Sequence, residues 1–289
     1  MKILGNLIKS RKVYFAETLK QSDKALEELR HEHFNSKTLR TLFYDPRFKS
    51  AEPDTFMIIN RETGEPYKVY SLLNLGPNKK DIWYNVYIYT KEAFSEIEGY
   101  GGCAHLGEKN FHMIKNQFGK LIMDTGFMNS KADDKYIGIG IRADQVHIDF
   151  ALKNGITTIP RESYPNAILY HLKMGFEPVQ KLVRVRSKKK LDKLMAKIYE
   201  QSKDIKEENF TPIVIEKKGI LGKRYYLDKN TTKAVATLRA VKKHLAETGN
   251  LRPRFINNAD NIDLELKGDN LQVWKNMLNG KPMFENTKY

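Results

Sequence analysis

The stretch that decides the fold reads Lys135-Tyr136-Ile137-Gly138-Ile139-Gly140-Ile141-Arg142. Two glycines stand one residue apart where a polar loop, residues 129–134, gives way to a predicted helix over 140–153. Glycine lets a ligand approach the backbone closely, because it has no Cβ. The first N–H groups of a helix lack backbone partners and carry a partial positive charge. The stretch therefore predicts an anion site suited to a pyrophosphate.

Two further patterns follow in order along the chain. The first, Ala151-Leu152-Lys153-Asn154-Gly155, ends the predicted helix with a glycine that tolerates positive φ. Residues 156–159 then predict a short strand that Pro160 ends. The second pattern, Ala167-Ile168-Leu169-Tyr170-His171-Leu172-Lys173-Met174-Gly175-Phe176, predicts another helix over 165–174.

In order and in approximate spacing, these three patterns resemble the GNAT family of N-acyltransferases. The pyrophosphate loop of that family runs Gln/Arg-x-x-Gly-x-Gly/Ala, and residues 135–140 resemble it with Lys135 in place of Gln or Arg. The family's closing pattern, Tyr-x-Lys-x-Gly-Phe, resembles the end of the second helix. Counted back from Gly175, His171 takes the position of the family's tyrosine, and Tyr170 lies beside it. The resemblance covers residues 119–180, about a fifth of the chain.

The resemblance implies an α/β (α+β) fold in which helices flank a mixed central sheet and a splayed parallel pair of strands holds pantetheine. It implies an acyl-CoA-dependent N-acyltransferase that uses acetyl-CoA, or another acyl-CoA, as cosubstrate for an unidentified amine, without a metal. The implied cofactor-binding residues are Lys135, Ile137, Gly138, Ile139, Gly140, Ile141 and Arg142. Tyr170 or His171 would be the general acid that protonates the leaving thiolate. Glu96, Glu98 and Asp124 are candidate bases.

Periodicity predicts the remaining elements of the chain. The predicted helices are 14–30, 103–117, 191–202 and 231–247, and the predicted strands are 55–60, 67–74, 82–90, 120–128, 176–186, 211–216 and 220–227. The charge run at residues 187–190 marks a boundary. We therefore predict a GNAT-like acyl-CoA-binding domain over 1–186 and a basic α+β C-terminal region over 187–289.

The balance of charge favours anionic partners. The chain has 50 Lys and Arg against 35 Asp and Glu, a formal net charge of +15. Basic clusters after residue 180 are interleaved with Tyr225, Tyr226 and Phe255, which is typical of a nucleic-acid surface. A solvated face is the other interpretation. The alternative function is thus a catalytically inactive GNAT-like fold that binds nucleic acid through its basic C-terminal half.

Several classes of protein and site are disfavoured. Cys103 is the single cysteine, so no intrachain disulfide forms, which favours a reducing compartment. The chain has no apolar run of about 18 residues for a membrane span, and we expect a cytoplasmic protein. Gly138-x-Gly140-x-x-Ala143 also fits a dinucleotide fingerprint, but that motif should directly follow a buried strand. Cys103, His105 and His112 do not make a complete set of zinc ligands.

Overall fold

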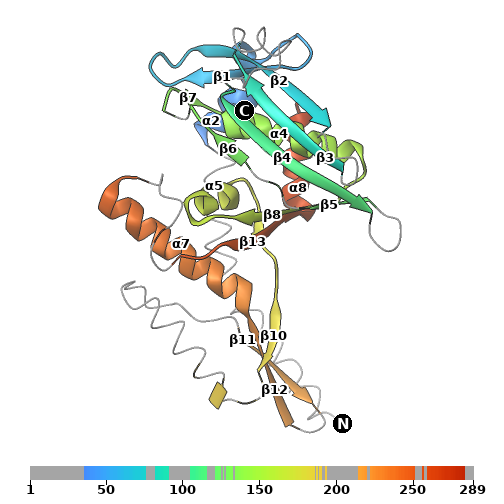
Figure 1. Cartoon of the computed structure of the whole chain (residues 1–289), viewed down its shortest axis with the longest axis vertical. Helices are drawn as coiled ribbons and strands as arrows, with labels where there is room; N and C mark the ends of the chain where they lie inside the picture. The colour runs from blue at the N-terminus through green and yellow to red at the C-terminus, as the bar shows by residue number, and fades with distance from the viewer. Residues whose placement is uncertain are drawn as a thin grey trace. The chain divides into compact units, whose positions relative to one another are not determined.

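The structure, a computed structural model, is a mixed α+β protein (Figure 1). It describes residues 36–75, 82–90, 105–115, 121–124, 126, 128–132, 134–185, 187, 189–190, 193, 214–219, 222–250, 256 and 259–283. Five α-helices lie within these residues: α2 (Lys37–Tyr44), α4 (Ile139–Lys153), α5 (Ile168–Lys173), α7 (Lys229–Thr248) and α8 (Gly268–Leu278). Among the described residues, no helix is both long enough and apolar enough to cross a membrane.

The chain divides into two compact units. The sheet unit comprises His33–Arg161 and Leu266–Tyr289, and the second unit comprises Met1–Glu32 and Glu162–Glu265. Among the described residues, the chain passes between the units within two strands, β8 (Thr158–Ser163) and β13 (Ile262–Lys267). The boundary predicted at residue 187 falls inside the second unit. The predicted helix over 14–30 lies outside the described residues, as does most of the one predicted over 191–202.

The sheet unit is built on a curled sheet of seven strands in the order β5-β4-β3-β2-β1-β7, with β6 also paired to β4. The strands are β1 (Thr55–Asn60), β2 (Pro66–Leu75), β3 (Ile82–Tyr89), β4 (Gly107–Lys115), β5 (Leu121–Asp124), β6 (Met128–Ser130) and β7 (Tyr136–Ile137). Each neighbouring pair is antiparallel, so this sheet differs from the mixed sheet with a parallel pair of strands that the resemblance implies. The predicted hairpin of β1 and β2 and the predicted strand β3 are confirmed.

The helix predicted over 103–117 is wrong, because β4 occupies most of that segment. Gly107, Lys109, Phe111 and Met113 are buried, and the residues between them are only half-buried. This period of two residues is that of a strand with one face on the core, whereas a helix needs a period near 3.6. Because Lys109 lies on the buried face, a pattern based on hydrophobicity alone does not show this alternation.

Helix α4 packs across the sheet of its unit, between β3 and β4 on one side and α8 on another. Phe150 of α4 lies against the rings of Tyr84 and Phe111, with ring centroids 4.6 and 5.4 Å away. Trp274 of α8 is fully buried and meets Phe43 of α2 edge to face at 6.0 Å. The residues after β13 therefore complete the core of the sheet unit.

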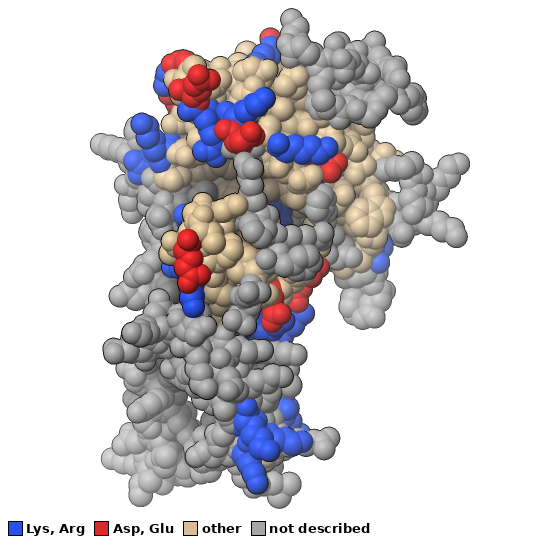
Figure 2. Space-filling model, turned by 60° about the vertical axis from the view of Figure 1, so that its left-hand side comes forward, with Lys and Arg blue, Asp and Glu red and all other residues tan. Residues whose placement is uncertain are grey.

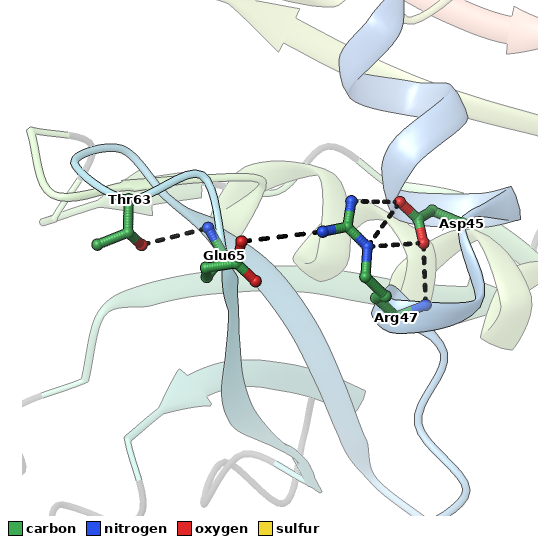
Figure 3. Close-up of polar contacts among 4 residues, drawn as sticks. All are labelled: Asp45, Arg47, Thr63 and Glu65. Carbon is green, nitrogen blue, oxygen red and sulfur yellow. Dashed lines mark hydrogen bonds and ion pairs between the residues drawn. The ribbon is translucent and has the colours of Figure 1, made fainter.

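An exposed cluster of polar contacts joins the short 3-10 helix η1 (Pro46–Phe48) to the turn between β1 and β2 (Figure 3). Asp45 accepts hydrogen bonds from the backbone N–H and the guanidinium of Arg47, which lower the pKa of Asp45. Arg47 Nη1 lies 3.9 Å from Glu65 Oε1, and the Glu65 N–H donates to Thr63 Oγ1. Exposed pairs of this kind contribute little to stability.

The other strands form two sheets of three strands each. One has the order β8-β13-β9, with β9 at Glu177–Pro178. The other has the order β10-β12-β11, with β10 at Leu182–Val185, β11 at Val214–Gly219 and β12 at Gly222–Asp228. The hairpin of β11 and β12 and the helix α7 confirm the predicted elements. β8 runs through Pro160 instead of ending there, which its position at the edge of a sheet permits.

Residues 179–261 form an insertion between two paired strands, which we call the basic insertion. β9 precedes it and β13 follows it, and these strands pair antiparallel through Leu264 with Pro178 and Glu265 with Glu177. Buried Asn230 donates from Nδ2 to the carbonyls of Val179 and Asp263, both at 2.8 Å, and so bridges the two ends of the insertion. The basic region is therefore bounded at both ends by the same small sheet.

Candidate anion-binding site on helix α4

A β-bulge lies between β5 and β6, opposite β4. His112 of β4 pairs with Asp124 of β5, whereas Lys109 pairs with Met128 of β6, so the register shifts by one residue between these pairs. Gly126 lies at the shift, and a Cβ added there would be 1.6 Å from the carbonyl oxygen of Asn110. Only glycine fits this approach. β-bulges are common beside active sites because they bend a strand and redirect its backbone.

The N-terminus of α4 has backbone donors without a side-chain cap. Gly138 is the N-cap residue, with φ 108°, and the first turn contains no acidic residue. Gly140, in that turn, is half-buried, and Lys135 just before the helix is exposed. The first N–H groups of a helix have no intrahelical acceptor, and the helix dipole adds positive potential. This arrangement is suited to a phosphate or pyrophosphate.

Gly138 is also required by the fold itself. Its positive φ disfavours other residues, and a Cβ there would lie 2.9 Å from Cδ1 of Leu42 on α2. Ile139 and Ile141 are buried, and Ile137 is half-buried in β7, where it pairs with Ile59. Within the predicted loop, Lys135 and Gly140 thus keep exposed surface, while Ile139 and Ile141 anchor the helix.

Arg142 has a structural position in the core of the sheet unit. Its guanidinium donates to the carbonyls of Leu42 at 2.7 Å and Met57 at 3.0 Å. It lies over the rings of Phe43 and Phe56, with Cζ 5.2 and 5.3 Å from their centroids. Burial lowers the pKa of Arg142 to about 9. The side chain therefore ties α4 to α2 and β1, which differs from the ligand contact predicted from the loop pattern.

A buried ionic triad lies close to the bulge. Asp144 of α4 accepts hydrogen bonds from Arg161 of β8 at 2.8 and 3.3 Å and forms an ion pair with Lys109 of β4. All three side chains are at most 4% exposed. Burial alone would raise the pKa of Asp144, but the charges of Arg161 and Lys109 outweigh burial and hold this pKa well below its ordinary value.

Burial also lowers the pKa of two basic side chains in this cluster, Lys109 and His147. Burial, and then the charge of Arg161, lower the pKa of Lys109 to about 7. Burial and the charges of Lys109 and Arg161 lower the pKa of His147 well below its ordinary value, so this imidazole is neutral. His147 packs on Phe111 with ring centroids 4.3 Å apart. A lysine that loses its proton near neutral pH is a candidate proton acceptor wherever a substrate reaches it.

Sequence reasoning missed this cluster. Lys109, Asp144 and Arg161 are too far apart in the chain to form a local motif. One signal was present: Asp144 lies on the same helical stripe as Ile148 and Ala151, both fully buried. An acid on a buried helix face needs a positive partner, so the stripe predicts that a cation is buried nearby without identifying it.

The two predicted acids lie together on α5 in the second unit. His171 is buried, and its Nδ1 lies 2.9 Å from the hydroxyl of Ser163. That hydroxyl donates to the Tyr164 carbonyl, so it accepts from His171, and Nδ1 carries the imidazole proton. Tyr170 is half-buried, with its ring 5.4 Å from that of His171. Tyr170 therefore has more exposed surface than His171.

The remaining candidates are only partly described by the structure. Glu96, Glu98 and Cys103 lie outside the described residues, and Asp124 ends β5 at the bulge. His112 stacks on Trp83 at 4.6 Å, and His105 forms a pair with Glu108 at 3.1 Å. In the described ranges, no group of three His, Cys, Asp or Glu residues is arranged to hold a metal ion.

Comparison with protein-family models, with curated proteins and with solved structures finds no match for this chain. The interpretation of the site therefore depends on its own geometry and on the motif resemblance over residues 119–180.

Proposed function

We propose that the protein is an acyl-CoA-dependent N-acyltransferase with a GNAT-like fold and acetyl-CoA as its acyl donor. The observation that carries this proposal is the N-terminus of α4, which begins at Gly138 without a side-chain cap and without an acidic residue in its first turn. The bulge at Gly126, between β5 and β6, supports the proposal because bulges redirect the backbone beside active sites.

The pyrophosphate of the donor would bind at this helix terminus. Its charge is complementary to the N–H groups of the first turn and to the helix dipole. Lys135 is exposed just before the helix and adds a positive charge. Ile139 and Ile141 hold the terminus in place through burial. Arg142 contributes indirectly, because its hydrogen bonds fix α4 against α2 and β1.

The transfer itself needs two proton movements. The nitrogen of a neutral amine attacks the carbonyl carbon of the thioester, a C–N bond forms and the C–S bond breaks. The amine nitrogen loses one proton, and the departing thiolate gains one. We assign the second proton to Tyr170 or His171, as the resemblance implies. Tyr170 is the stronger candidate because its phenol is half-buried, whereas His171 is buried against Ser163.

The chemistry also agrees with a reducing environment. Free CoA carries a thiol, which stays reduced in the cytoplasm, and the chain contains a single cysteine that has no partner for an intrachain disulfide. We therefore place the proposed activity in the cytoplasm.

Calorimetric titration with acetyl-CoA tests the donor site directly. We expect micromolar binding to the wild type and a loss of at least tenfold in Gly140→Glu, because a carboxylate at the helix terminus repels the pyrophosphate. Glutamate in a first turn is compatible with a helix, so this variant should stay folded. Gly140→Ala is the matched control and should bind as the wild type does. Gly138 is unsuitable, because any side chain there meets Leu42.

Different results of these measurements would contradict different parts of the proposal. Equal affinity of Gly140→Glu and wild type would show that the pyrophosphate binds elsewhere. Absence of binding at millimolar acetyl-CoA would refute the proposed activity. If binding is found, thiol release in the presence of an accepted amine tests the acid: Tyr170→Phe should lower kcat by about 10²–10⁴ without changing the affinity for acetyl-CoA. An unchanged kcat would remove Tyr170 from the mechanism.

A further inference from the structure

The positive charge of the protein is concentrated in the basic insertion. Residues 179–261 contain 21 Lys and Arg and 9 Asp and Glu, a net charge of +12, whereas the whole chain has a net charge of +15. The rest of the molecule contains 29 Lys and Arg against 26 Asp and Glu and is therefore almost neutral. A genome-wide excess of lysine would spread the charge evenly, so the concentration indicates a function of the insertion.

Basic side chains at one end of the insertion are exposed. Arg184 of β10 and, after it, Lys189, Lys190 and Lys193 are all exposed. Within the part of the chain that the structure describes, none of these four forms an ion pair closer than 4.0 Å. Figure 2 shows Lys and Arg side chains gathered at the end of the second unit that carries β10, β11 and β12, with no described Asp or Glu visible among them.

The register of the hairpin adds further positive charge to this end. Lys217 pairs with Arg224, and Lys218 pairs with Lys223, on two successive positions next to the Gly219–Gly222 pair. The register therefore places four basic residues at adjacent positions of the hairpin.

An aromatic residue lies in the same small sheet. Tyr226 of β12 is half-buried and is the partner of both Arg184 on β10 and Ile215 on β11. Positive charge next to aromatic rings is the combination that single-stranded nucleic acid uses, because phosphates need cations and bases stack on rings. A small anion would need only one or two of these groups.

We propose that the basic insertion binds a nucleic acid through its phosphate backbone, with the exposed side chains of Arg184, Lys189, Lys190 and Lys193 as the contact surface and Tyr226 in the adjoining sheet. Phosphates spaced along a nucleic acid match cations that are spread over β10 and the residues after it. Binding releases counterions from the nucleic acid and is therefore strongly dependent on salt. The Asn230 bridge between Val179 and Asp263 gives this surface a fixed base.

Fluorescence anisotropy with labelled single-stranded RNA, single-stranded DNA and duplex DNA tests the proposal on the full chain. The variant Arg184→Gln/Lys189→Gln/Lys190→Gln/Lys193→Gln should bind at least tenfold more weakly than the wild type. Its plot of log affinity against log salt should be less steep, by about 0.7–0.9 for each phosphate that the variant no longer neutralises. The matched control, Lys37→Gln/Lys49→Gln/Lys131→Gln/Lys275→Gln, removes four exposed lysines of the sheet unit and should bind within twofold of the wild type.

Three results would overturn the proposal. The first is an absence of binding by the wild type to all three nucleic acids at 50 mM salt. The second is equal weakening by the two variants, which would indicate an effect of net charge alone. The third is binding to vesicles with phosphatidylserine but not to nucleic acid, which would identify a membrane surface. Thermal unfolding of both variants near the wild-type temperature ensures that weaker binding does not come from unfolding.

Discussion

The sheet unit and the basic insertion use the same side chains in opposite ways. Lys109, Arg142 and Arg161 are buried in the sheet unit and donate to a carboxylate or to backbone carbonyls. Arg184 and Lys190 in the insertion are exposed. The difference teaches that the charge of a residue does not indicate its role until its burial is known. Buried cations hold elements together, whereas exposed cations are available to a partner.

The largest effect is expected from removing the charge at the centre of the buried triad. Asp144→Asn leaves Lys109 and Arg161 buried together without their anion, which should lower the free energy of unfolding by about 3–5 kcal/mol. Asp149→Asn is the matched control on the same helix, since Asp149 is 40% exposed and pairs with Lys153 on the surface. Its effect should be below about 1 kcal/mol. Urea unfolding measures both, and equal effects would contradict the structural role of the triad.

Two glycines, one in each region, give a second comparison, because only one of them has room for a Cβ. Gly126→Ala places a Cβ against the Asn110 carbonyl, at a distance of 1.6 Å without relaxation, and should cost about 3 kcal/mol as the strands move apart. Gly249 ends α7 in the basic insertion with φ 65° and no atom within 4 Å of an added Cβ. Gly249→Ala should therefore cost only the positive φ, about 1 kcal/mol. Thermal unfolding that ranks the two variants in reverse would contradict the bulge.

A smaller effect should appear in the dependence of stability on pH. The pKa of Lys109 is lowered to about 7 in the folded protein, whereas an unfolded lysine keeps a pKa near 10.4. Between pH 7 and 9 the unfolded state therefore binds the additional proton, and stability should rise with pH by up to about 1.4 kcal/mol per unit. Lys109→Met should remove this contribution to the slope. Parallel curves for the two proteins would show that Lys109 stays protonated.

The smallest effect on stability is expected from substituting the exposed cations of the basic insertion. Arg184→Gln and Lys190→Gln should each change the free energy of unfolding by less than about 0.5 kcal/mol. A decrease above about 1 kcal/mol in urea unfolding would show that these side chains support the fold, and their assignment to a partner would then need revision.

Local patterns were sufficient to predict elements with a strong period. The β1–β2 hairpin was predicted from two strand-like segments with a turn at Gly64 between them, and Gly155, predicted to close the helix, follows the end of α4 at Lys153 with φ 71°. β4 was missed because Lys109 interrupts its apolar face. The partner that makes Lys109 suitable for burial lies on α4, and no local pattern connects the two.

Local patterns also could not predict that the basic region is an insertion between two paired strands. A charge run at residues 187–190 marks a change of composition. Composition does not show that the chain returns to the sheet unit after the basic insertion. The return depends on β13 pairing with β9 and on Trp274 packing against Phe43. Both are contacts between distant residues. The helix predicted over 140–153 corresponds to α4, which begins one residue earlier at Ile139. The inward direction of Arg142 was not predicted, because it depends on acceptors in α2 and β1.

The late position of α8 has a consequence for synthesis on the ribosome. The strands of the sheet unit, α2 and α4 are made first, but Trp274 of α8, which packs on Phe43, is made only after the whole basic insertion. Phe43 is therefore without this partner until then, and the contacts of α8 with α2 and α4 close loops of more than one hundred residues. Such distant contacts form slowly. Chaperone dependence during translation should accordingly be greatest in the interval before α8 leaves the exit tunnel.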